Sequence, residues 1–172
     1  AVYQGLPCEA GGRIMVCLYQ LDPATGGIRQ LTFEQDSDWC PTVMPDGRVM
    51  YLRWEYSDLA HSNSRRLFRM NPDGTNQNEI YGSNSYFPNS FFHARPMPGS
   101  QGRIIGVAGG HHGIARSGRL LILDPSMGRK EAEGVVQEIP GRGKKVDPIV
   151  RDRLVDGVWP QFLMPFPLNE KY

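Results

Sequence analysis

Two adjacent histidines are the residues of this chain whose types and spacing point most directly to chemistry. His111 and His112 lie between Gly109-Gly110 and Gly113, and the glycines would let the backbone approach a bound group closely. Imidazole nitrogens bind transition metals, and protonated imidazole attracts anions. Because adjacent residues on a regular strand point to opposite sides, both rings can reach one ligand only from an irregular loop. We expect either a structural, hydrogen-bonded pair or part of a metal site.

A metal at this pair would need a further ligand from another loop, such as Asp58 or His93. Arg116 follows the pair and could bind a ligand or brace a loop carbonyl or carboxylate. The sequence contains no Gly-x-Ser-x-Gly, no phosphate-binding glycine loop and no His-Glu-x-x-His. No catalytic residue is therefore assigned, and the chain alone is not expected to be an enzyme. The cofactor is unknown, and a metal ion is one candidate.

The elements that must position these residues come from an internal repeat. Residues 66–72 (RLFRMNP) are similar to 119–125 (RLLILDP) and to 17–23 (CLYQLDP). The prolines that end these copies are 49 and 53 positions apart. Such a period is typical of β-propeller blades with loop insertions.

The turns inside the repeat predict β-hairpins. A Pro-Asp-Gly turn interrupts the apolar run at residues 39–52, and a second, at residues 72–74, follows residues 66–71. Four short antiparallel strands within about forty to fifty residues make one propeller blade. The predicted fold is all-β, with about three blades' worth of four-stranded antiparallel sheets. Because propellers need at least four blades, we expect part of a larger propeller.

The expected organisation has four parts, namely 1–38 as the end of one blade, 39–86 as a blade, 87–145 as a blade, and 146–172 as a linker and the start of the next. Residues 1–12 are predicted to be a loop, and 149–155 a short helix or a strand. Aromatic residues before proline recur at Trp39, Phe87 and Trp159, and we expect them to pack between blades.

Two family resemblances follow from these motifs. Residues 31–32 (LT), 41–48 (PTVMPDGR) and 67–74 (LFRMNPDG) resemble the TolB-type propeller repeat, with Val43 and Met44 in place of the usual aromatic residue and serine. Residues 111–120 (HHGIARSGRL) resemble the propeller-bearing middle domain of the hydrazine synthase α-subunit family. Both resemblances imply a propeller. The sequence has no Cys-x-x-Cys-His haem motif, so the redox function does not carry over.

A four-stranded blade places its longer connecting loops on one face, where binding residues usually lie. In this chain those loops carry the candidate residues for a ligand or partner face, Trp54, Tyr56, Asp58, His61, Tyr86, His93 and Arg116, together with His111 and His112.

Composition limits the classes of partner. The 172 residues contain 19 Lys and Arg against 18 Asp and Glu, so the charge gives no reason to expect nucleic acid. No apolar run is long enough to span a membrane. The three cysteines match no zinc signature; they are either small buried side chains or, for Cys8 and Cys17 in an exported protein, a disulfide.

The sequence therefore favours a non-catalytic propeller module for protein–protein interaction or scaffolding within a larger exported bacterial protein, periplasmic or extracellular. Its partners would be the remaining blades, from its own chain or from other subunits. The alternative is the propeller part of a multidomain redox or hydrolytic enzyme, with a metal or cofactor near His111 and His112.

Overall fold

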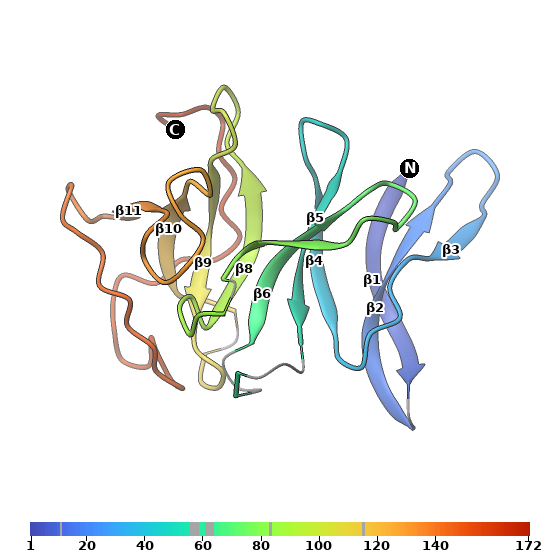
Figure 1. The fold of residues 1–172 in the computed structure, drawn as a ribbon, viewed down its shortest axis with the longest axis horizontal. Coiled ribbons are helices and arrows are strands. Elements are labelled where there is room, and N and C mark those ends of the chain that lie inside the picture. Colours follow the sequence, from blue (N-terminus) through green and yellow to red (C-terminus); the bar gives the residue numbers. More distant parts are fainter. Residues whose placement is uncertain (11, 56–58, 61–63, 83, 115) are drawn as a thin grey trace.

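The computed structural model describes residues 1–172 apart from 11, 56–58, 61–63, 83 and 115. Within the described residues the chain forms strands and turns but no helix, and therefore no helix that could cross a membrane. In this described part of the chain, eleven strands form three antiparallel sheets. Figure 1 shows the sheets side by side, in the order in which the chain builds them.

Each sheet is a meander in which sequence neighbours pair. The first contains β1 (Val2–Ala10), β2 (Arg13–Leu21) and β3 (Ile28–Gln30). The middle sheet contains β4 (Asp38–Val43), β5 (Val49–Trp54), β6 (Arg65–Met70) and β7 (Asn78–Tyr81). The third contains β8 (Ser90–Pro96), β9 (Ile104–Gly109), β10 (Arg119–Leu123) and β11 (Val135–Ile139).

The Pro/Gly turns close hairpins as predicted. Met44 N–H donates to the carbonyl of Arg48 at 2.8 Å across the first Pro-Asp-Gly, and Gly47 has a φ of 83°. This left-handed conformation suits glycine, because a side chain there is strained. The matching turn in the third sheet closes from Met97 N–H to the carbonyl of Arg103 at 2.9 Å.

The middle sheet is buried on both faces. Consecutive residues of β5 are buried, and because side chains alternate along a strand, they lie on opposite faces of the sheet. On one face Val49 and Tyr51 pack with Leu18 of the first sheet. On the other, Met50 and Leu52 pack with residues of the third sheet such as Phe91. The apolar contacts thus run from sheet to sheet, and each sheet depends on its neighbour for burial.

Three local expectations prove wrong. Residues 2–10 form strand β1 rather than a loop, paired with β2 along their whole length. Residues 149–155 form turns and irregular backbone rather than a helix or strand. Phe87 is buried as expected, but Trp159 is 77% exposed and does not pack between sheets. Strand β1 forms because it pairs with β2 along its length, a contact that the local pattern of residues 1–12 does not encode.

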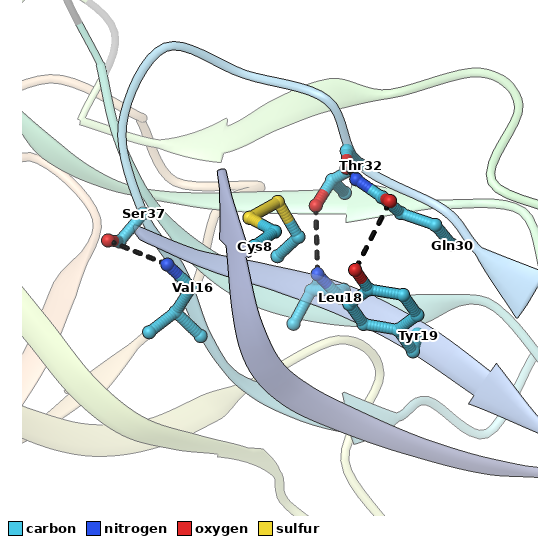
Figure 2. Close-up of a disulfide and its surroundings, with 8 residues drawn as sticks. Cys8, Val16, Leu18, Tyr19, Gln30, Thr32 and Ser37 are labelled. Atoms are coloured by element: carbon cyan, nitrogen blue, oxygen red, sulfur yellow. Dashed lines mark hydrogen bonds between the residues drawn. A yellow bond between two sulfur atoms is a disulfide. The ribbon is translucent and has the colours of Figure 1, made fainter. Parts of the chain in front are cut away.

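The first sheet is braced by a disulfide between Cys8 on β1 and Cys17 on β2, which realises the second of the two cysteine hypotheses. Figure 2 shows that the segment after β3 is hydrogen-bonded to β2. Val16 N–H donates to Ser37 Oγ at 3.1 Å, and Leu18 N–H donates to Thr32 Oγ1 at 2.9 Å. Since β3 pairs with only three residues of β2, these hydroxyls satisfy backbone donors that a longer strand would otherwise bond.

Removing the disulfide is expected to destabilise the chain. The bridge closes a loop with a sequence separation of 9, for which chain entropy gives roughly 2–3 kcal/mol. The double variant Cys8→Ala/Cys17→Ala should therefore lose about that much free energy of unfolding, measured by urea denaturation. Cys40→Ala is the matched control. Without a reducing agent, it should unfold at the wild-type midpoint. Equal midpoints for the double variant and wild type would contradict the prediction.

Candidate functional site

A cavity of about 600 Å³ opens where the three sheets converge. Its wall includes Tyr3 and Gln4 of β1, Trp39 and Cys40 of β4, and His93 of β8. Arg95, Arg116 and Met164 also line this cavity. The leading strands β4 and β8, each the first of its sheet, therefore bring their side chains to one place.

A bulge at the same position in both leading strands produces this convergence. The pairing of β4 with β5 shifts between Trp39 and Thr42, and that of β8 with β9 shifts between Phe92 and Arg95. The first bulged residues, Cys40 and His93, both have a φ of 54°. Bulges bend a strand and redirect side chains, and they are common next to functional sites.

Equivalent residues of the two leading strands touch one another. The rings of Trp39 and Phe92 have centroids 6.1 Å apart. One position further along, Cys40 Sγ lies 3.7 Å from His93 Nδ1. The two strands are therefore related by a repeat of structure as well as of sequence.

A third segment near the C-terminus has the same pattern. Leu163-Met164-Pro165 parallels Trp39-Cys40-Pro41, and Met164 has a φ of 49°. The segment is attached to the third sheet by an isolated bridge between Gly118 and Phe162. The ring of Phe166 lies 5.1 Å from the guanidinium carbon of Arg95, again joining equivalent positions of successive units.

A second cavity, of about 320 Å³, shares Trp39 and Arg116 with the first. Arg65 covers the ring of Trp54 at 4.5 Å and donates from Nη1 to the carbonyl of His111 at 3.1 Å. The His111 ring meets Trp54 edge-on at 5.4 Å. The end of β5 and the start of β6 thus contact the loop after β9 through aromatic and cationic side chains.

The histidine pair is held by the segment at 151–156. The rings of His111 and His112 are 4.3 Å apart and nearly perpendicular, and His112 Nδ1 lies 2.8 Å from Asp152 Oδ1. A Cβ on Gly110 would come within 2.2 Å of the carbonyl oxygen of Asp152. This glycine therefore allows close approach of another chain segment, whereas the sequence suggested close approach of a ligand.

Of the candidate residues, Trp54, His111, His112 and Arg116 lie at or beside the second cavity, and His93 lies on the first. Tyr86 lies apart from both cavities, where its backbone N–H donates to Glu131 Oε1 at 3.1 Å. Tyr56, Asp58 and His61 lie outside the described residues.

Sequence reasoning missed three further residues of this region, namely Cys40, Arg65 and Arg95. Cys40 and Arg95 reach the cavity through the bulges of β4 and β8, which the sequence does not signal. Among the residues that the structure describes, no three or more His, Cys, Asp or Glu side chains cluster as a metal site would require. A metal at the histidine pair stays a prediction.

The groups around the first cavity combine neutral and cationic character. Burial raises the pKa of the Cys40 thiol, while a backbone contact with His93 and the charges of Arg116 and Arg95 oppose the rise. Burial lowers the pKa of His93, and the same two arginines lower it further. At neutral pH the thiol and imidazole are therefore uncharged, and the positive charge resides on the guanidiniums.

A buried ion pair anchors the leading strand β4 immediately before Trp39. Arg53 Nε lies 3.1 Å from Asp38 Oδ1, and its Nη1 lies 3.2 Å from Glu34 Oε1. The guanidinium also covers the Phe68 ring at 4.7 Å. Burial raises the pKa of the Asp38 carboxyl to about 6, although the charge of Arg53 acts in the opposite direction.

This shift predicts a pH dependence of stability. Because the pKa of Asp38 in the folded state is about 6, above its usual 3.8, its stabilising contribution is complete below the lower value and is lost as pH rises through the higher one. The free energy of unfolding of wild type minus that of Asp38→Asn should fall between about pH 4 and 6, by up to about 3 kcal/mol. Urea denaturation at several pH values measures the difference. A constant difference across that window would refute the assignment.

The class that this fold defines is an all-β protein of three meandering antiparallel sheets. No family model and no curated protein matches the chain. A search of solved structures finds hydrazine synthase from Kuenenia stuttgartiensis, with a TM-score of 0.50 and 16% sequence identity over 66% of this chain. The match covers 18% of that protein's chain, so this chain spans less than a fifth of its length. At this identity the similarity concerns the fold alone.

Proposed function

We propose that the three sheets are blades of a larger β-propeller. The chain would be a non-catalytic module for protein–protein interaction or scaffolding. The observation that carries the proposal is the contact between equivalent residues of successive units. Trp39 meets Phe92, Cys40 meets His93, and Arg95 meets Phe166. A radial arrangement of similar sheets around a channel brings equivalent positions together in this way.

The strand order supports the same arrangement. The repeated segments 17–23, 66–72 and 119–125 fall on β2, β6 and β10 and the turns that follow them. In the middle and third sheets this is the third strand, whereas in the first sheet it is the second. The first sheet therefore lacks the strand that corresponds to β4 and β8. In a propeller that strand is the innermost of its blade.

Two surfaces are open for the missing parts. One is the edge of β1, which pairs with no other described strand on the side away from β2, because an unpaired edge presents backbone donors and acceptors to any further strand. The other is the segment that resembles a fourth leading strand, where Met164 is 67% and Phe166 70% exposed. Remaining blades, from the same chain or from other subunits, would cover both surfaces.

The Cys8–Cys17 disulfide supports a location outside the cytoplasm, since disulfides persist in oxidising compartments. The resemblance to the TolB-type repeat agrees with a bacterial, periplasmic or extracellular protein. The chain would then act as a scaffold within a larger exported protein.

The proposal predicts that the chain by itself self-associates through its open apolar surface. Phe166→Asp should shift the chain toward monomer in sedimentation velocity, because a charge replaces an exposed ring that other blades would bury. Met127→Asp is the matched control, since Met127 is also exposed but lies in the turn after β10. A wild-type chain that remains a stable, unassociated monomer with a cooperative melt would overturn the proposal.

The second candidate is the propeller part of an enzyme with a metal or cofactor near the histidine pair. It is favoured by the contact of His111 with His112 and of His112 with Asp152 beside the smaller cavity. It predicts that tag-free protein carries a transition metal, that His111→Ala loses it, and that the control Tyr86→Phe keeps it. Elemental analysis decides, and metal-free wild-type protein counts against this candidate.

A further inference from the structure

Two arginines at the larger cavity have aromatic partners but no acidic ones. The guanidinium carbon of Arg95 lies 5.1 Å from the Phe166 ring, and that of Arg116 lies 5.7 Å from the Phe92 ring. Neither guanidinium forms an ion pair or hydrogen bond with another residue in the described part of the chain.

Six other arginines of the described part of the chain do have acidic partners. They are paired with carboxylates in Arg48–Asp46, Arg53–Asp38, Arg66–Glu79, Arg103–Asp124, Arg119–Glu138 and Arg153–Asp156. The described walls of the two adjoining cavities also contain no Asp or Glu. The chain as a whole is almost neutral, so the excess of positive charge is a local property of this site.

The backbone keeps Arg116 in an uncommon conformation at the junction of the cavities. Its φ is 60°, in the left-handed region that side chains rarely adopt. Such conformations persist where the surrounding structure holds them, and they are frequent at ligand sites. Gly118, two residues later, allows close packing, because a Cβ there would come within 2.0 Å of the carbonyl oxygen of Ala108.

We infer that the larger cavity binds a small molecule with a carboxylate or phosphate group, which Arg95 and Arg116 hold. The planar guanidinium matches both oxyanions in bidentate geometry. Trp39, Val16 and Met164 on the wall provide apolar contact for the remainder of the ligand. The volume of about 600 Å³ falls in the range of small-molecule sites. The inference goes beyond the proposed scaffold role and does not depend on it.

The uncharged groups on the wall suit this ligand class. His93 and the Cys40 thiol lie in contact with each other and can supply polar contacts without adding negative charge. The free thiol also provides a probe, because Cys40 is the one cysteine outside the disulfide.

Calorimetric titration with inorganic phosphate and with succinate tests the inference and distinguishes the two oxyanions. We expect saturable binding of at least one of them, weakened at least about tenfold in Arg95→Gln and in Arg116→Gln, since a charge-assisted contact is lost. Arg13→Gln, on an exposed residue at the start of β2, is the control and should bind as wild type does. Circular dichroism checks that each variant is folded.

A second measurement detects binding without calorimetry. The ligand that binds should slow alkylation of Cys40 by iodoacetamide in wild type and leave the rate unchanged in Arg116→Gln. Absence of saturable binding for both anions, or equal binding by wild type and the arginine variants, overturns the inference. Because binding is measured whatever the association state, failure here leaves the propeller proposal standing, and failure of self-association leaves this one standing.

Discussion

The bulge in each leading strand is the feature on which the rest of the structure depends. An extra residue in β4 and in β8 places Cys40 and His93 in the left-handed region and bends both strands at the same level. The bend brings Trp39 against Phe92 and directs the following residues toward the cavity. Without the bulge, strict alternation would reverse the face of every residue after it.

The hairpins were predictable because their signals are local. Pro-Asp-Gly specifies a turn whatever the surroundings, and the repeated segments 66–72 and 119–125 contain most of β6 and β10. Strand β1 was not predictable in the same way. It contains Gly5 and Pro7, which read as a loop, and it becomes a strand through pairing with β2 and the bond from Cys8 to Cys17.

The sequence was enough to predict that the candidate residues lie on one side of the molecule, but not which side chains contact one another. Loop topology places Trp54, His111 and Arg116 together, because loops that follow equivalent strands emerge on the same side. The role of Gly110 could not be read, since its close neighbour Asp152 lies about forty residues away in the chain. The participation of Cys40 and Arg95 depends on the bulges, which shift pairing without leaving a standard motif in the sequence.

The two open features of the molecule differ in chemistry. Apolar side chains at Met164 and Phe166 are exposed beside β8, whereas the adjoining cavity holds two guanidiniums that have no acidic partner among the described residues. An apolar surface gains free energy when protein covers it, but unpaired guanidiniums in a partly enclosed space gain it from an anion. Arg95 belongs to both features, since it stacks on Phe166 and lines the cavity. Covering the segment by another blade would therefore fix the arginine that holds the anion, and the two kinds of binding would be coupled through this contact.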